Sequence, residues 1–279
     1  MKVIFKKVAS MFLTLTLIFS VAAIAPISVG AVETNSESVG ETYTSGDFEY
    51  ELVERYDGDT EQSYKVARIT EYRGSDTDVI IPSEIDGYKV VAIDKLYYYE
   101  NTDKIKSFTI PEGVSYIEDY VFKNYDNLEN IFVNAQNEDY CDIDGVLFSL
   151  NNETKAPYSL IIYPRAKSNT TYQIPEGINN LEFAAFYECS NLINLNVPKS
   201  IESFPVVDFW DYKCWENNSV ENINISSENE TYSSVDGVLF NKDKTELILY
   251  PAGKRQANYS IPETVNEISE GAFYTANNL

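Results

Sequence analysis

Short segments in which apolar and polar residues alternate recur along the chain, and each one ends at a proline. Four of them place apolar residues at the same two positions: Phe108 and Ile110, Tyr172 and Ile174, Leu195 and Val197, Tyr259 and Ile261. Alternation with a period of two predicts β-strands with one buried face. Because proline has no N–H for the strand ladder, we expect each strand to end there.

The residues that follow these prolines repeat at fixed offsets. Val or Ile stands three residues after Pro111, Pro175, Pro198 and Pro262, an apolar residue stands six after, and Phe stands eleven after in every copy. Pro175 and Pro198 are 23 residues apart, whereas the two longer intervals are 64 residues each. A unit this short cannot bury its apolar face alone, so neighbouring units must stack. The pattern predicts a solenoid whose coils each contain a strand, a second short strand and a brief helical or 3₁₀ turn.

The two longer intervals share the pentapeptide DGVLF, at residues 144–148 and 236–240, and each copy is followed by a Tyr-Pro step. Asp-Gly between apolar residues favours a tight turn, so each interval is expected to contain a β-hairpin that projects from the solenoid. A calcium loop is the alternative, since Asp139, Asp142 and Asp144 cluster in the first copy. The second copy keeps only Asp236 of these carboxylates, which favours the hairpin.

The strand positions between the apolar residues define a candidate binding surface. Their side chains are polar and uncharged, and they should point outward: Ser107, Thr109, Thr171, Gln173, Asn194, Asn196, Asn258 and Ser260. Such a face could form hydrogen bonds to a protein or a glycan with little desolvation of full charges. An ordinary solvated strand face explains each residue equally well.

Three stretches of the chain resemble the BspA-like, or type 5, bacterial leucine-rich repeat family: FTIPEGVSYIEDYVFKNYDNLENI, QIPEGINNLEFAAFYECSNLINL and SIPETVNEISEGAFYTANNL. The resemblance covers roughly residues 48–279 and implies a β-rich α/β solenoid with short strands, short helical or 3₁₀ turns and inserted β-hairpins. The chain departs from the family pattern where Val121 and Asp208 replace the alanine before Phe, and where only Cys189 keeps the cysteine. Residues 82–105 fit loosely and are expected to form an irregular first coil.

The family resemblance also implies a function. Proteins of this kind are mostly secreted or surface proteins of bacteria associated with adhesion to host matrix proteins or to other cells. We therefore expect a non-enzymatic protein that binds a protein partner or a host cell-surface ligand. The alternative is a carbohydrate-binding or spacer module attached to a secreted enzyme system, for which the exposed aromatic candidate is Trp210, next to the core position of Phe209.

The ends of the chain predict a domain order. Residues 1–31 have three lysines, an apolar run and a small-residue ending at Ala31, which is typical of a secretory signal peptide cleaved after that residue; an uncleaved anchor is the alternative. Residues 32–47 are expected to be a flexible linker and residues 48–78 a capping hairpin. The solenoid would occupy residues 79–279, and a further strand should follow Leu279, so the repeat is expected to continue beyond it.

Composition excludes several classes of function. The chain has 21 Lys plus Arg, 44 Asp plus Glu and no His. Loss of residues 1–31 would remove three lysines and no acid, which gives a net charge of 18 − 44 = −26, so nucleic acid and anionic membranes would be repelled. Without His, triads and metal sites that use imidazole are excluded. The three cysteines, of which Cys141 and Cys214 could pair, have no zinc-site spacing, and we predict no catalytic residue, cofactor or metal.

Overall fold

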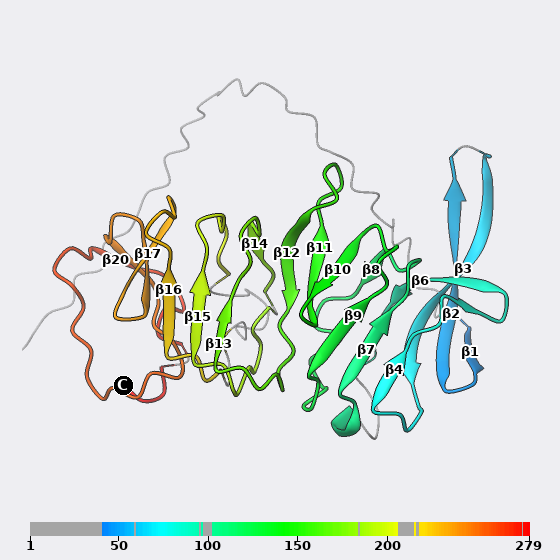
Figure 1. Cartoon of the computed structure of the whole chain (residues 1–279), viewed down its shortest axis with the longest axis horizontal. Coiled ribbons are helices and arrows are strands. Elements are labelled where there is room, and N and C mark those ends of the chain that lie inside the picture. The colour runs from blue at the N-terminus through cyan, green and yellow to red at the C-terminus, as the bar shows by residue number, and fades with distance from the viewer. Residues whose placement is uncertain are drawn as a thin grey trace, which may run out of the picture. The chain divides into compact units, whose positions relative to one another are not determined.

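The computed structural model describes residues 41–58, 60–94, 96, 102–183, 185–205, 215, 218–274 and 276–279. These residues contain twenty β-strands and one 3₁₀-helix, η1 (Thr102–Lys104), and no α-helix (Figure 1). Gly40–Leu279 form one compact unit. No helix in the described part of the chain is both long and apolar enough to cross a bilayer. The predicted signal peptide lies outside the described residues.

Two three-stranded parallel sheets are formed by the first strand of each repeat. One sheet has the order β4 (Asp78–Ile80), β7 (Ser107–Ile110) and β9 (Asn130–Val133), and the other has the order β13 (Thr171–Gln173), β15 (Asn194–Val197) and β16 (Asn222–Ile225). The alternation before the Ile-Pro and Val-Pro steps predicted β7, β13 and β15. This pattern missed β9 and β16, because Val133-Asn134 and Ile225-Ser226 stand where the other copies have proline.

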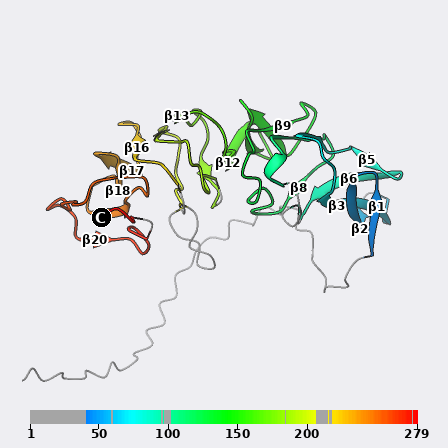
Figure 2. The same ribbon diagram turned by 90° about the horizontal axis from the view of Figure 1, so that it is seen from below.

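A second series of parallel pairs is formed by the short strands that follow the turns. The pairs are β6 (Tyr88–Ile93) with β8 (Tyr116–Ile117), β12 (Pro157–Ile162) with β14 (Asn180–Leu181), and β19 (Glu246–Leu249) with β20 (Glu267–Ile268). Figure 2 shows β9, β13 and β16 on one side of the unit and β8 and β20 on the other. The apolar repeat positions fill the space between the two series, and Val114, Phe122, Ile178 and Phe186 are at most 3% exposed.

The stacked-repeat prediction is confirmed in its strands, but the α/β description and the helical turns need correction. The strands form five separate sheets, and the described residues after β8, β14 and β20 form successive turns. Their backbone hydrogen bonds span three residues, as from Val121 N to Glu118 O (3.2 Å) and from Lys123 N to Tyr120 O (2.9 Å). Tyr120 and Gly271, which stand at the same offset from proline, have φ of 60° and 76°. A residue in the left-handed region ends any helical run, which explains why no helix forms in these two described segments.

The two DGVLF segments form the predicted hairpins. They join β10 (Tyr140–Ile143) to β11 (Val146–Leu150) and β17 (Tyr232–Val235) to β18 (Val238–Asn241). Asp144 and Gly145 have φ of 53° and 72°, which is the conformation of a type I′ turn. The expectation that the hairpins project is wrong. Gly145 O accepts a hydrogen bond from Ile131 N (2.9 Å), and Val146, Leu147 and Phe148 are all 0% exposed, so the hairpin is part of the core.

Two antiparallel strands pack at the N-terminal end of the repeats. They are β2 (Phe48–Asp57) and β3 (Gln62–Tyr72), and β3 also pairs in parallel with β6. The short strand β5 (Glu84–Ile85) pairs with β6 from the other side. The expected linker differs from the structure at its end, because β1 (Thr42–Ser45) pairs antiparallel with β2. Tyr43 and Tyr50 stack across this pair with ring centroids 5.5 Å apart. This aromatic contact helps to hold β1 against β2.

The strand expected at residues 258–261 does not form within the described chain. Asn258 and Ser260 are exposed, and Ile261, expected in the core, is 41% exposed. The equivalent strand β13 is held by β15, because Thr171 lies opposite Asn194, 23 residues later. Alternation predicted a strand at residues 258–261, but a strand is stable only when it is paired with a neighbouring strand.

Candidate binding surface

Six polar residues lie in register on β13, β15 and β16, the three strands that stand side by side in Figure 1. We call this surface the asparagine face, and its members are Thr171, Gln173, Asn194, Asn196, Asn222 and Asn224. They form two rows across the three strands, because Asn194 lies opposite Thr171 and Asn222, and Asn196 lies opposite Gln173 and Asn224. The intervening residues Leu195 and Ile223 are 0% exposed, so burial of the apolar side fixes which residues face outward.

Hydrogen bonds between neighbouring strands order these amides. Asn222 Nδ2 donates to Asn194 Oδ1, and Asn224 Nδ2 donates to Asn196 Oδ1, both at 2.9 Å. Asn194 Nδ2 in turn donates to Thr171 Oγ1 at 3.3 Å. Parallel strands lie roughly 4.8 Å apart, which allows equivalent amides to bond in this way. Each amide has more donors and acceptors than one such bond uses, so the face retains ordered hydrogen-bonding capacity for a ligand.

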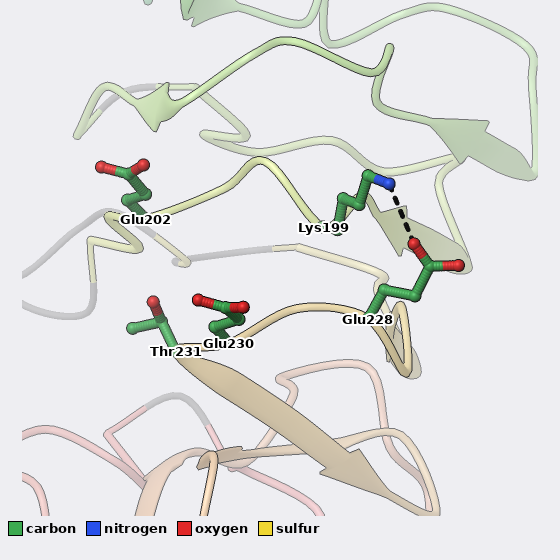
Figure 3. A pocket seen from close by; sticks show the side chains of 5 residues that line it. All are labelled: Lys199, Glu202, Glu228, Glu230 and Thr231. Carbon is green, nitrogen blue, oxygen red and sulfur yellow. Dashed lines mark hydrogen bonds and ion pairs between the residues drawn. The ribbon is translucent and has the colours of Figure 1, made fainter.

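An open groove lies past the ends of β15 and β16. Its volume is about 430 Å³, and it is lined by Lys199, Glu202, Glu228, Glu230 and Thr231 (Figure 3). Lys199 Nζ lies 2.9 Å from Glu228 Oε2; this hydrogen bond raises the pKa of Lys199 and lowers that of Glu228. Both side chains are more than half exposed, so the pair adds little to stability. Glu202, Glu230 and Thr231 lie on the opposite side of the groove (Figure 3).

The structure brings together four of the eight predicted strand residues and separates the others. Ser107 and Thr109 belong to β7, in the other sheet of this series. Ser107 does not face solvent as expected: it is 6% exposed, and its Oγ donates to Asp78 Oδ1 at 2.6 Å. Asn258 and Ser260 lie outside any strand. Asn222 and Asn224 were missed by the sequence reasoning, although the pattern NINIS at residues 222–226 matches NLNVP at 194–198.

The chain has two tryptophans, of which Trp210 is the candidate proposed above for a carbohydrate site. Trp210, like Phe209 and Cys214, lies outside the described residues. Trp215 is 4% exposed and stacks between Phe186 and Phe204, with ring centroids at 5.7 and 5.3 Å. Trp215 Nε1 donates to Pro205 O at 2.9 Å. This ring therefore belongs to the core, where no sugar can reach it.

The acidic residues near the first hairpin serve the backbone. Asp142 Oδ1 accepts a hydrogen bond from Val133 N (2.8 Å) and Oδ2 accepts one from Gly145 N (3.3 Å), which ties the hairpin to β9. Over the described ranges, no three His, Cys, Asp or Glu side chains converge in a way that could hold a metal ion. Cys141 is half-buried, and Cys189 is fully buried.

A comparison with protein families found one match. The family model described as "BspA type Leucine rich repeat region" matches residues 88–154 and 165–245, with six copies of its repeat. The two matched ranges together cover more than half of the chain and include every strand of the asparagine face. No match was found among curated proteins.

Solved structures of bacterial leucine-rich repeat proteins are also similar to the chain. The pneumococcal vaccine antigen PcpA shares 19% identity with a TM-score of 0.47, over 84% of this chain and 62% of PcpA. A leucine-rich repeat protein from Eubacterium ventriosum shares 19% identity with a TM-score of 0.40, over 73% and 63%. A leucine-rich cell surface protein from Faecalibacterium prausnitzii shares 18% identity with a TM-score of 0.41, over 84% and 67%. The chain thus spans less than two thirds of the length of the first two.

Proposed function

The chain belongs to the BspA-type leucine-rich repeat family, and from this premise we propose that it is a secreted or cell-surface protein that binds a protein partner through the asparagine face. The proposal assigns no catalytic residue to the chain. It places the protein outside the cell, where a host matrix protein or a neighbouring cell would present the partner. A family scaffold of repeated strands supports this role, because stacked repeats present extended surfaces for binding.

The observation that carries the proposal is that the asparagine face consists of two rows of polar side chains ordered by hydrogen bonds between neighbouring strands. Gln173, Asn196 and Asn224 lie in register on three neighbouring strands, and two of these side chains are already joined by a hydrogen bond. A partner that binds such a face does not have to order flexible side chains, so less entropy is lost than at a surface of independent residues. The face itself carries no formal charge, so a neutral polar surface of a partner can approach with little desolvation of ions.

Paired substitutions test this assignment. Gln173→Glu with Asn196→Asp adds two charges, while Asn196→Asp keeps the acceptor oxygen that Asn224 uses. The matched control is Gln256→Glu with Asn266→Asp, which makes the same chemical change at exposed amides away from the face. Binding to immobilised extracellular-matrix proteins should weaken at least about tenfold in the first variant and change little in the control. Circular dichroism should report the same fold for both.

Three outcomes would count against the proposal. Equal binding by the two variants would exclude the asparagine face as the site. A parent chain that binds none of the matrix proteins would refute the adhesion role. Binding to a glycan array in place of proteins would favour the carbohydrate-binding alternative. Secretion is tested separately by N-terminal sequencing of protein from the culture medium: a chain beginning at Val32 is expected, and an intact Met1 would contradict cleavage.

A further inference from the structure

The β4–β7–β9 sheet presents a different outer surface from the asparagine face, although both sheets use the same repeat register. Ile80, Thr109 and Phe132 lie opposite one another on its three strands. We call these three residues the apolar row. In the other sheet the corresponding row is Gln173, Asn196 and Asn224. Two large apolar side chains thus stand where the repeat otherwise places amides.

The exposure of the apolar row is not explained by packing within the chain. Ile80 is 70% exposed and Phe132 is 44% exposed, whereas their strand neighbours Val79 and Ile131 are 1% and 0% exposed. A reversed register is therefore excluded, because each strand already buries the opposite face. Neither Ile80 nor Phe132 belongs to a core cluster of the described residues. Single exposed apolar residues are common, but three strands in register place these two about 10 Å apart on one surface.

Carboxylates stand on the two sides of the apolar row, one before it and one after it along the strands. Asp78 precedes Ile80 by two residues on the same face of β4, and its carboxylate accepts hydrogen bonds from Ser107 Oγ (2.6 Å) and Thr77 Oγ1 (3.1 Å). On the other side, three residues after Thr109, Glu112 Oε2 accepts a hydrogen bond from Asn134 Nδ2 (3.1 Å). Lys106 is also close to Asp78, and it is paired with Glu129 at 3.1 Å. The rim of the row is therefore negative, in a chain whose net charge is −23.

We propose that the apolar row is a contact site for a protein segment that carries an apolar side chain between positively charged residues. The apolar side chain would cover Ile80 and Phe132 beside Thr109, and the flanking cations would approach Asp78 and Glu112. An apolar centre with a charged rim is the usual composition of a protein interface. The inference deepens the proposed function and rests on it, because it names the chemistry of the partner and gives it a second point of contact.

Other occupants fit the row less well. A sugar ring stacks on a flat aromatic face, whereas Ile80 presents a branched aliphatic side chain. Nucleic acid and anionic lipid would meet like charge on both sides of the row. A second copy of the chain would bring a net charge of −23 against the same charge, which opposes association. A basic segment gains from both the apolar centre and the acidic rim.

The test uses the full chain with isotope-labelled isoleucine methyl groups and three capped pentapeptides as probes. The first peptide alternates lysine with leucine and phenylalanine, the second replaces both apolar residues with serine, and the third replaces the lysines with glutamate. The Ile80 methyl signal, identified by its loss in Ile80→Thr, should shift and saturate with the first peptide. The second and third peptides should bind at least about tenfold more weakly, and added salt should weaken the first.

A double variant and a matched control decide where the peptide binds. Ile80→Thr with Phe132→Thr keeps residues suited to strands and should abolish saturable binding, read from the remaining isoleucine methyl groups. Gln173→Glu with Asn196→Asp should leave peptide binding unchanged, because these residues lie on the other sheet. A wrong assignment of the apolar row can therefore be told apart from a wrong assignment of the asparagine face. An Ile80 signal that does not shift at saturating peptide would overturn the proposal. So would a dimer by sedimentation that the double variant dissociates, because a second copy would then occupy the row.

Discussion

Asn229 anchors the second hairpin to the preceding repeat, and its removal should strongly destabilise the protein. The residue is 0% exposed. Its Nδ2 donates to the carbonyl oxygens of Pro198 (3.1 Å), Lys199 (3.3 Å) and Ile201 (2.9 Å). Its Oδ1 accepts from Thr231 N (2.9 Å) and Tyr232 N (2.7 Å). One side chain therefore satisfies five backbone groups, three in the turn after β15 and two at the start of β17.

The cost of Asn229→Ala follows from these five contacts. A hydrogen bond contributes roughly 1 kcal/mol net, and a buried group left without a partner costs roughly 1–3 kcal/mol. Water that enters the vacated space would satisfy part of the lost bonding. We therefore expect the free energy of unfolding to fall by about 3–5 kcal/mol. The same substitution at Asn137, which makes the equivalent contacts to Pro111, Val114, Asp139 and Tyr140, should have a similar effect.

Urea denaturation followed by circular dichroism measures this change. Asn152→Ala is the matched control, because that asparagine is exposed and its substitution should alter stability by less than about 0.5 kcal/mol. The reasoning would be refuted if Asn229→Ala behaved like the control.

The structure also predicts that the Asn-x-Thr sequence at Asn229 is never glycosylated in the folded protein, since the amide nitrogen is buried between three carbonyl groups.

Two further predictions concern buried groups that titrate. Burial raises the pKa values of Tyr140, Tyr163 and Tyr172, that of Tyr140 to about 12. The stability that neutral Tyr140 contributes is complete below about pH 10 and is lost as pH rises from 10 through about 12. Tyrosinate absorbance should therefore appear together with unfolding, and a gradual titration of these rings near pH 10 in folded protein would be contrary to this. Burial also raises the pKa of Cys189, which is 0% exposed. A thiol reagent should modify it only in urea, as peptide mapping would show, whereas rapid modification of the native chain would place it at the surface.

The repeat pattern made much of the local structure predictable. Alternation before Pro111, Pro175 and Pro198 identified β7, β13 and β15 and gave the correct buried side for each. Asp-Gly identified both hairpin turns, because few other dipeptides adopt two successive residues with positive φ. These features depend on properties of a few consecutive residues. They could be predicted because the preferred backbone geometry and the apolar side of a strand are encoded locally.

The candidate site was only partly predictable for the opposite reason. The predicted face combined Thr109 with Gln173 and Asn196, but strand pairing divides these residues between two sheets. The prediction omitted Asn224, whose strand has Ser226 where the pattern expects proline. It also omitted Ile80, although the alternation seen before the other prolines, applied to Pro82, places Ile81 inward and Ile80 outward.

The amino-acid sequence thus determined the repeat, its buried positions, the turns of the hairpins and the acidic character of the chain. The tertiary structure decided which outward residues share a surface, which predicted strand finds a partner, and where the hairpins pack. The physical reason is that side-chain direction follows from a period of two residues within one strand. A sheet surface, in contrast, depends on hydrogen bonds between strands that are 23 or 28 residues apart, as between Asn194 and Thr171 or Asn222.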